Sequence, residues 1–381
     1  MTRRTSTRTE GARFWRSRRT SAWRGPRSLI SSAAACMCLL SPACQDDVDD
    51  DDDGDGDDDG GAVFAEAVDG LAHGVALGAW SSGSDLLVAG GRLSAKPGDE
   101  YGSPGVVVRI TPEGKACRAL EADRTLWWIH GAEGPGADPD NWYAVGEGGL
   151  IVHHLPGGAS VDESVVSDAI LYGVWAGEDQ ILAVGGDPFG PNSGEVWRRD
   201  PGSEAEQGSW SLVAGDLPGV AFKVWDHWIV GDGVAWRLDG DTLVEHHPPG
   251  GERLTTVRGR SDDDVYAVGG FSGPVLLHWD GASWSEMTID VACVSGGLNG
   301  VWTAPGEDLW IGGFFGGAAR FDGERWSCSA EPLTFEHYHA VWRHQGETWW
   351  VGGNLLKAGG SALSLAWTGG EPPSSVLDSC D

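Results

Sequence analysis

The segment Leu298-Asn-Gly-Val-Trp302 opens a run of four short β-strand patterns that decides the fold of this chain. The other three are Asp308-Leu-Trp-Ile-Gly-Gly313, Ala319-Arg-Phe-Asp-Gly323 and Arg325-Trp-Ser-Cys328. Each pattern is rich in β-branched or aromatic residues, and the intervening Gly-Gly and Asp-Gly pairs favour the positive φ angles of tight hairpin turns. One such sheet is too small to bury its apolar faces. The pattern therefore predicts a unit that packs against copies of itself.

The same pattern recurs along the chain from residue 61 to residue 370. In each copy an inner strand ends in a bulky residue, and an apolar strand that ends in Gly-Gly follows it. Four tryptophans stand ten residues before the first glycine of their pair, namely Trp80, Trp175, Trp302 and Trp342 before Gly90, Gly185, Gly312 and Gly352. Arg258 replaces the tryptophan in the fifth copy. Because the spacing is equal in equal copies, we expect these indoles to pack between sheets rather than to form a sugar-stacking surface.

Seven copies predict an all-β fold, a single β-propeller of seven four-stranded blades, although six or eight blades also fit the pattern. Closing such sheets into a ring removes the edges that would invite aggregation. The last copy lacks a clear fourth strand. Either residues 374–379 supply it, or residues 62–68 supply it and the N-terminal side of the domain closes the ring.

The repeats resemble a known family at the residues that follow the Gly-Gly pairs. Gly269-Gly270, Trp279 and Trp284 are similar to a kelch-type β-propeller repeat, as are Gly312-Gly313, Phe321 and Trp326. The chain also resembles bacterial propeller lipoproteins whose blades contain Val-Trp, Asp-Val-Tyr-Ala-Val-Gly-Gly, His-Trp-Asp-Gly and Trp. The resemblance implies a propeller over about residues 61–370. It leaves the function open, since kelch-like propellers include copper oxidases and glycan lyases.

Composition excludes one class of partner. The 381 residues include 60 Gly and 21 Trp, as expected for turns and for wedges between sheets, and the formal net charge is −31. The first 44 residues hold nine Arg and a single acid, so the remainder is still more acidic, near −39. Such a body repels nucleic acid and does not adhere to anionic lipid by charge alone. No nucleic-acid partner is expected.

The N-terminus has the features of an export signal. An Arg-rich opening leads into an apolar stretch, Leu29 to Leu40, which is too short to span a bilayer as a permanent helix. Ser41-Pro-Ala-Cys44 resembles a bacterial lipoprotein signal in which Cys44 receives the lipid, although Ser41 stands where Leu is usual. We therefore expect residues 1–43 to be a signal peptide and Cys44 to be lipidated, with plain secretion as the alternative. Location in the cell envelope, on the outer membrane or at the cell surface, follows, and secretion or a periplasmic location is the alternative.

Residues 44–61 are expected to form an acidic, disordered tether, and residues 62–381 the propeller. Asp46 to Gly61 contains 11 Asp and almost no apolar side chain, so it cannot offset its ordering entropy. Asp49, Asp51 and Asp53 imitate the start of an EF-hand calcium loop, but Gly60 occupies the position that needs a bidentate Glu. Loose cation binding is expected there rather than a specific metal site.

Four cysteines remain in the body after Cys44, and they allow three pairings. Cys117 lies in the outer strand of the first copy and Cys380 follows the last copy, so the two are neighbours in a closed ring. Cys293 and Cys328 border consecutive copies. We predict the disulfides Cys117–Cys380 and Cys293–Cys328. A metal site at these cysteines is not expected, because no CxxC pair accompanies them.

Histidines and loop aromatics are the candidate binding residues. His337 and His339 alternate along a strand and so share a face at the entry to an inner strand, where propellers form their central mouth. Long connections follow the Gly-Gly pairs and open on one face of the ring. Aromatic side chains on such loops over a rigid scaffold suggest a binding surface. The candidate residues are Arg92, Tyr101, Phe189, Phe271, Phe314, Phe315, His337, Tyr338 and His339.

The sequence favours a binding function over catalysis. It contains no nucleophile elbow, no phosphate-binding loop and no supported pair of catalytic carboxylates. We expect an exported, non-enzymatic, monomeric propeller that binds a protein or a polysaccharide through its loop-rich face, with no cofactor and with membrane contact only through the lipid anchor. One alternative is an enzyme, a metal-dependent oxidase or a glycan-acting lyase, that uses His337 and His339. Another is a structural spacer on the surface.

Overall fold

The computed structural model describes residues 64–66, 74–81, 83, 85–92, 105–111, 116–132, 137–200, 208–328, 334–355, 364–368 and 380. The chain divides into two units, Met1–Asp57 and Asp58–Asp381, and all described residues belong to the second. The expected signal peptide, Cys44 and the acidic tether lie outside the described residues.

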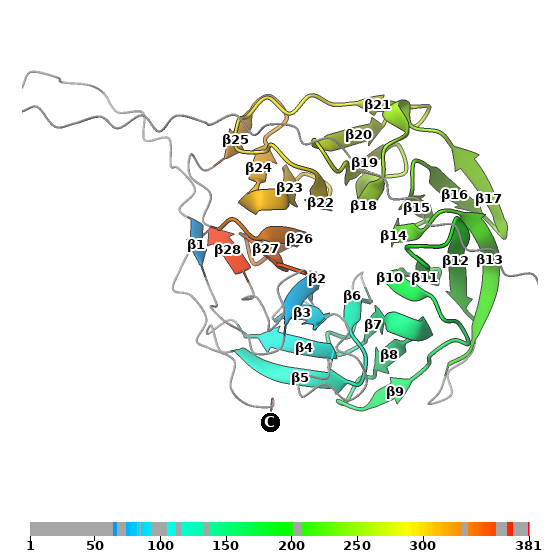
Figure 1. Ribbon diagram of the computed structural model, residues 1–381. Helices are drawn as coiled ribbons and strands as arrows, with labels where there is room; N and C mark the ends of the chain where they lie inside the picture. The colour runs from blue at the N-terminus through cyan, green and yellow to red at the C-terminus, as the bar shows by residue number, and fades with distance from the viewer. Residues whose placement is uncertain are drawn as a thin grey trace, which may run out of the picture. The chain divides into compact units, whose positions relative to one another are not determined.

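The described residues form seven four-stranded antiparallel sheets arranged around a common axis (Figure 1). Six of them, here called blades 1 to 6, consist of four strands that are consecutive in sequence. Blade 1 contains β2 (Val75–Ser81), β3 (Leu86–Gly91), β4 (Gly105–Ile110) and β5 (Ala116–Ala122). Blade 2 contains β6 (Leu126–Gly131), β7 (Trp142–Gly146), β8 (Ile151–His154) and β9 (Ser160–Asp162). Blade 3 contains β10 (Ile170–Ala176), β11 (Ile181–Gly186), β12 (Asn192–Arg199) and β13 (Trp210–Pro218).

The second half of the ring repeats this plan. Blade 4 contains β14 (Ala221–Trp225), β15 (Trp228–Gly231), β16 (Ala235–Asp239) and β17 (Thr242–His246). Blade 5 contains β18 (Leu254–Ser261), β19 (Asp264–Gly269), β20 (Val275–Trp279) and β21 (Trp284–Glu286). Blade 6 contains β22 (Leu298–Trp302), β23 (Leu309–Gly313), β24 (Ala318–Phe321) and β25 (Trp326–Cys328). Three short 3₁₀ turns, η1 (Glu147–Gly149), η2 (Pro249–Gly251) and η3 (Phe314–Gly316), lie in connections.

A seventh four-stranded sheet, here called the closing sheet, joins the two ends of the domain. It contains β26 (His337–His344), β27 (Glu347–Gly353) and β28 (Ser364–Thr368), and its outer strand is β1 (Phe64–Glu66). Phe64 pairs with Thr368 and Glu66 with Ala366, so the N-terminal side of the domain supplies the last strand. This decides between the two closing strands that the sequence left open. Residues 374–379 lie outside the described residues.

The innermost strand of each sheet packs against the innermost strand of the next, and β2 contacts both β6 and β26, so the ring is closed (Figure 1). Strands inside the blades are buried on both faces because a neighbouring blade covers each face. All six residues of β3 and all five of β23 are buried, whereas residues of the outer strand β17 are exposed or intermediate. The all-β propeller expected from the repeats is therefore present.

The Gly-Gly pairs are explained by a close approach of backbone to backbone. A Cβ added to Gly90 would overlap the carbonyl oxygen of Val75, and one added to Gly352 would overlap that of His337. In both cases the oxygen belongs to the inner strand paired with the Gly-Gly strand. Glycine at this position lets the two strands come together where the ring is tightest.

The four repeated tryptophans are buried, and Trp80 and Trp225 lie between neighbouring sheets, as expected. Trp175 and Trp342 lie instead at the axis of the ring, where both rings flank Arg258 of blade 5. Trp80 is 1% exposed, and its ring occupies the space where a Cβ on Gly131 of blade 2 would stand. Trp225 lies in the same way against Gly259 of blade 5. Trp175, Trp302 and Trp342 are 6–7% exposed. These indoles are wedges of the core and offer no face to a sugar.

Both expected disulfides are present. Cys117 of β5 bonds to Cys380, and Cys293 bonds to Cys328 of β25. The backbone N–H of Cys380 also donates to the carbonyl of Arg118 at 3.0 Å, which fixes Cys380 against the outer edge of blade 1.

Candidate functional site

Every inner strand carries a one-residue β-bulge at the same place, which the sequence analysis did not find. The pairing register with the second strand skips one residue in each sheet: Leu77, Trp127, Tyr172, Phe222, Thr255, Asn299 and His339. A bulge re-aims the side chain of its extra residue and breaks the alternation of the strand. Seven bulges at one level of the ring therefore place one non-alternating side chain per sheet near the start of each inner strand.

The bulge residues form two different arcs. In blades 2 to 4 they are aromatic: the Trp127 and Tyr172 rings meet edge to face at 4.8 Å between centroids, and Tyr172 and Phe222 are 5.2 Å apart. In blades 5 and 6 and the closing sheet they are polar and bond to backbone. Thr255 Oγ1 donates to the Leu298 carbonyl at 2.7 Å and Asn299 Nδ2 to the Tyr338 carbonyl at 3.1 Å.

The axis of the ring is filled below this level. Lys223 of β14 is 8% exposed, its ammonium lies 4.2 Å from the centroid of the Trp128 ring, and it donates to the Tyr172 carbonyl. Burial lowers the pKa of the Lys223 amine to about 7. A cavity of about 20 Å³ remains beside it, lined by Trp128, Lys223 and Thr256 among others, which is too small for a substrate.

The other end of the axis is closed by a collar of side chains that stand three residues after each bulge. Its members are Trp80, His130, Trp175, Trp225, Arg258, Trp302 and Trp342. The Arg258 guanidinium lies between Trp175 and Trp342, 5.4 and 4.8 Å from their ring centroids. The His130 ring is 4.3 Å from that of Trp175. Arg258 and His130, which stand where the other members are tryptophan, therefore pack in the same layer through cation–π and ring contacts.

The loops after the Gly-Gly pairs bring four of the expected binding residues into one group. Phe271 in the β19–β20 loop lies 6.1 Å from Phe314 of η3, and the Phe314 and Phe315 rings are 6.2 Å apart. His337, the first residue of β26, lies 4.7 Å from Phe314 and 5.3 Å from Phe315. We call Phe271, Phe314, Phe315 and His337 the aromatic rim. Three sheets contribute to it.

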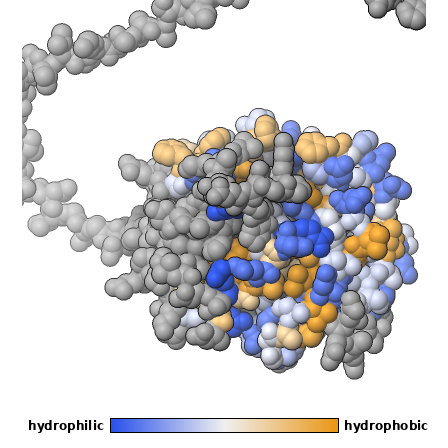
Figure 2. Space-filling view, turned by 60° about the horizontal axis from the view of Figure 1, so that its bottom comes forward, coloured by the Kyte–Doolittle hydropathy of each residue, from blue (hydrophilic) through white to orange (hydrophobic). Residues whose placement is uncertain are grey.

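The aromatic rim is a surface feature. Phe271 is 77% and Phe315 55% exposed. Gly296 makes room for it, because a Cβ there would stand 2.7 Å from the Cβ of Phe314. The Gly316 N–H donates to the Glu336 carbonyl at 2.7 Å and so ties η3 to the start of β26. Large phenyl groups are held in place without being covered. Elsewhere, the face seen in Figure 2 shows apolar residues only in scattered patches among hydrophilic ones.

Phe315 has a strained backbone. Its φ and ψ are 57° and 34°, in the left-handed region that bulky residues avoid. The same 3₁₀ turn in blade 2, η1, places Gly148 at the matching position with φ 61° and ψ 41°. Glycine adopts this conformation without penalty, whereas another residue costs about 1–3 kcal/mol. Blade 6 therefore holds an exposed phenyl group where a glycine would be more stable.

The two histidines of β26 are neutral near pH 7. Burial lowers the pKa of His337, partly opposed by Glu336. Burial also lowers the pKa of His339 to about 4, and the nearby His337 and Lys223 act in the same direction. His339 Nε2 donates to the Gly353 carbonyl at 3.1 Å, and the two imidazole centroids are 6.5 Å apart.

The pKa of His339 predicts a loss of stability in acid. In the unfolded chain the imidazole titrates near 6.5, and in the fold near 4, so the unfolded state binds more protons between these values. The contribution of His339 to the free energy of unfolding is fully present above pH 6.5 and is lost as the pH drops towards 4. When the pH falls from 6.5 to 4.5, the free energy of unfolding of the wild type should fall by about 2 kcal/mol more than that of His339→Gln, which keeps a donor for Gly353. Urea unfolding at several pH values measures this. Parallel pH curves for the two proteins would contradict it.

The remaining expected residues do not join the rim. Phe189 is 95% exposed but lies in the β11–β12 loop of blade 3. Arg92 follows β3, and its carbonyl accepts a hydrogen bond from Thr125 Oγ1 at 2.8 Å. The structure corrects the expectation for Tyr338, which is 2% exposed and packs near Trp350, because alternation turns it away from the face of His337. Tyr101 lies outside the described residues.

Phe335 is a surface aromatic that the sequence analysis missed. It is 80% exposed and precedes His337 by two residues. Phe335 precedes an inner strand and does not follow a Gly-Gly pair, so it was not among the aromatic residues expected in the loops after those pairs. The signal that would have found it is the arrangement of Phe335, His337 and His339 at alternate positions.

Comparison with solved structures supports the fold. The crystal structure of selenomethionine-substituted virginiamycin B lyase from Staphylococcus aureus aligns with a TM-score of 0.58 and 12% sequence identity, over 80% of this chain and 98% of that chain. The WD40 β-propeller domain of Doa1 aligns with a TM-score of 0.56 and 8% identity, over 80% and 97% of the two chains. No family model and no curated protein matches the sequence. At these identities the likeness shows a β-propeller and nothing about chemistry.

Proposed function

We propose that this protein is a non-enzymatic binding module whose propeller docks a partner protein on the aromatic rim. The cavity beside Lys223 at the axis is too small for a ligand, which favours the faces of the ring as the binding surface. On one face, exposed phenyl groups from the loops of blades 5 and 6 meet beside His337 of the closing sheet. Aromatic anchors on a rigid scaffold are the usual centres of protein interfaces.

The conformation of Phe315 is the observation that carries this proposal. Backbone strain at a bulky, exposed residue persists only where something other than stability maintains it, and such outliers cluster at binding sites. The matching glycine of η1 shows that the turn itself does not require a side chain. Folding alone would favour glycine at position 315. A partner that contacts the ring explains phenylalanine.

The chemistry of the rim favours a protein over a polysaccharide. Sugar sites combine an aromatic face with polar groups that bond to hydroxyls, and tryptophan or tyrosine often serve both purposes. The rim contains three phenylalanines, which have no polar atom, and one imidazole. Its phenyl pairs meet near right angles, 88° for Phe271 with Phe314 and 78° for Phe314 with Phe315. Upright, apolar rings fit pockets on a protein better than they stack on a flat pyranose.

The substitution Phe315→Gly separates binding from folding. We expect it to weaken partner binding at least tenfold, since loss of an interface anchor costs about 2 kcal/mol or more, while the melting temperature stays level or rises because the strain is relieved. Partners are recovered from an envelope extract on immobilised wild-type protein, and a recovered protein is then purified and titrated by calorimetry against wild type, Phe315→Gly and Phe271→Ser.

Phe189→Ser is the matched control. It removes a still more exposed phenyl group from another blade and should leave the affinity unchanged. The proposal fails if Phe315→Gly binds as tightly as wild type, or if Phe189→Ser weakens binding as much as Phe271→Ser. Specific glycan binding that requires the rim would replace the protein partner with a polysaccharide. Failure to bind either a protein or a glycan would favour a structural spacer.

We also propose that the propeller is exported and held at the cell envelope through a lipid on Cys44. Arg-rich and apolar segments before Cys44, the acidic stretch after it and the two disulfides of the propeller support this. Among the described residues no helix is long and apolar enough to cross a membrane. Mass spectrometry of the mature N-terminus tests the proposal. A diacylglyceryl mass on Cys44 is expected, and an unmodified N-terminus would indicate secretion.

A further inference from the structure

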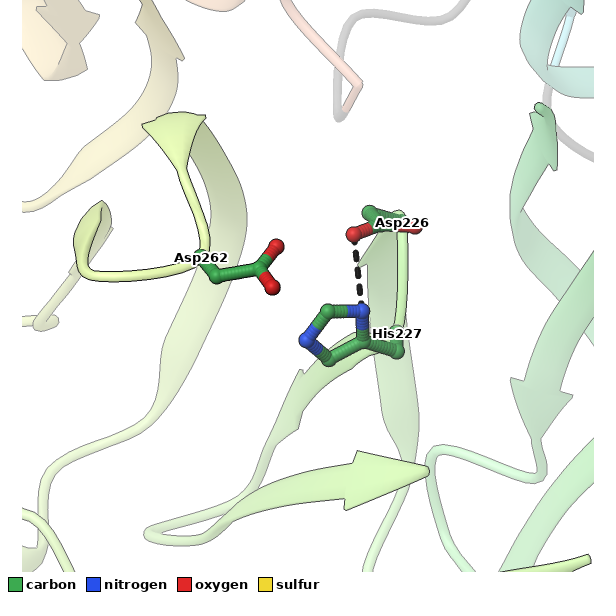
Figure 3. Close-up of side chains that lie close together, drawn as sticks. All are labelled: Asp226, His227 and Asp262. Carbon is green, nitrogen blue, oxygen red and sulfur yellow. Dashed lines mark ion pairs between the residues drawn. The ribbon is translucent and has the colours of Figure 1, made fainter. Parts of the chain in front are cut away.

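Three ligating side chains meet at the turns of two neighbouring blades, away from the aromatic rim. Asp226 and His227 form the two-residue connection between β14 and β15, and Asp262 lies in the turn between β18 and β19. One ring nitrogen of His227 and one oxygen of each carboxylate all lie within 4.8 Å of one another (Figure 3). The shortness of this connection matters here, because a two-residue turn places His227 next to the turn of blade 5.

Hydrogen bonding leaves one nitrogen of His227 available as a ligand. Its Nδ1 lies 2.7 Å from an oxygen of Asp226. A carboxylate accepts, so Nδ1 donates to Asp226 and Nε2 is the ring nitrogen that remains for a ligand. Nε2 is shielded from solvent and has no hydrogen-bond partner in the described part of the chain. Asp226 therefore orients the imidazole in the way that a hydrogen-bonded carboxylate orients a metal-binding histidine.

The Asp262 carboxylate points towards this free side of the imidazole (Figure 3). No hydrogen bond joins Nε2 to this carboxylate in the described part of the chain. Zn²⁺ binds nitrogen and carboxylate oxygen at about 2.0–2.2 Å, so two of its ligands stand about 3–4 Å apart. The spacing of the three groups accommodates such an ion with small side-chain movements.

We propose that Asp226, His227 and Asp262 form a site for a divalent transition-metal ion of the Zn²⁺ type that links blade 4 to blade 5. His227 Nε2 and Asp262 are its protein ligands, Asp226 orients the imidazole, and water completes the coordination. An imidazole among the ligands favours transition metals over Ca²⁺, which requires six to eight oxygens. Two direct protein ligands imply an affinity in the micromolar range rather than that of a closed structural site.

This site is independent of the proposed partner binding. Consecutive hairpin connections alternate between the two ends of the strands, so the β14–β15 and β18–β19 turns lie at the opposite end from the β19–β20 loop that carries Phe271. A negative result for the metal site therefore does not contradict the proposal for the aromatic rim, and the reverse also holds.

Calorimetric titration of the metal-free mature protein with Zn²⁺ tests the site, with Co²⁺ absorption as a second readout. We expect one saturable equivalent beyond the loose binding of the acidic tract, and a Zn²⁺-dependent rise in melting temperature. His227→Gln and Asp262→Asn should each raise the Kd at least tenfold and abolish the rise. A visible Co²⁺ band with nitrogen coordination should disappear in His227→Gln.

His247→Gln is the control, because His247 is an exposed imidazole that pairs with a single carboxylate, Glu245, at 3.1 Å. It should bind Zn²⁺ like the wild type. Asp226→Asn should weaken binding less than His227→Gln, since the amide still contacts the ring. Wild-type binding by both His227→Gln and Asp262→Asn, or no saturable binding by the wild type, overturns the proposal. Circular dichroism confirms that each variant is folded.

Discussion

Replacing Cys117 and Cys380 by serine is expected to lower the free energy of unfolding by about 5 kcal/mol. The two cysteines are separated by 263 residues, so the bond restricts almost the whole unfolded domain. In the chain-entropy model, the stabilisation grows with the logarithm of the closed loop. The bond also holds Cys380 against β5, the outer strand of blade 1, whose inner strand β2 packs against β26 where the ring closes.

The second disulfide provides an internal comparison. Cys293 and Cys328 are 35 residues apart and lie on the connection to blade 6 and on its outer strand, so Cys293→Ser with Cys328→Ser should cost about 3–4 kcal/mol. Urea unfolding of both double variants and of the wild type, all under oxidising conditions, measures the difference. A larger loss for the short loop than for the long loop would contradict the chain-entropy explanation.

Replacing Glu163 by alanine is expected to cost about 3–5 kcal/mol, because it leaves buried donors and a cation without their partner. The Glu163 side chain is fully buried and receives hydrogen bonds at 2.9–3.0 Å from His153, Arg199, Trp210 and the Gly208 N–H. Burial opposes ionisation, but these donors outweigh it and hold the pKa of Glu163 below its usual range. Glu163 follows blade 2, while Arg199 and Trp210 belong to blade 3.

The adjacent arginine supplies a control for this prediction. Arg198 pairs with Asp241 across the next interface, but the Asp241 side chain is 86% exposed. An exposed ion pair contributes little, so Asp241→Asn should change the stability by less than about 1 kcal/mol. Chemical denaturation at pH 7 compares the two variants. Equal losses for Glu163→Ala and Asp241→Asn would show that burial does not set the strength of the Glu163 contacts.

If the metal site and the aromatic rim are both correct, the two faces of the ring have different chemistry. The rim gathers apolar rings from the longer loops, whereas the opposite turns carry charged groups on short connections. Both belong to hairpin connections, because the β19–β20 and β23–β24 loops that follow Gly-Gly pairs carry the rim, and the two-residue β14–β15 and β18–β19 turns carry the metal ligands. Function is then confined to loops on a scaffold whose core is the same in every blade.

Local patterns were sufficient for the architecture. The interval between tryptophan and Gly-Gly depends on the length of one hairpin, and Gly90 and Gly352 show why glycine is required where strands approach closely. The order of copies around a ring then made Cys117 a neighbour of Cys380. Closure of the ring by residues near Phe64 was one of two options, and only the strand pairing selected it.

The sites were decided by tertiary structure. Phe271, Phe314 and His337 come from three different sheets, and their contact depends on the curvature of the ring and on the bulges, which no spacing within one blade reveals. Asp262 meets His227 across 35 residues because two turns at neighbouring blade ends converge. Sequence periodicity is a property of one strand or hairpin, so it predicts which faces are buried. The meeting of loops from separate blades is set by how those blades pack, and it became visible only in the folded ring.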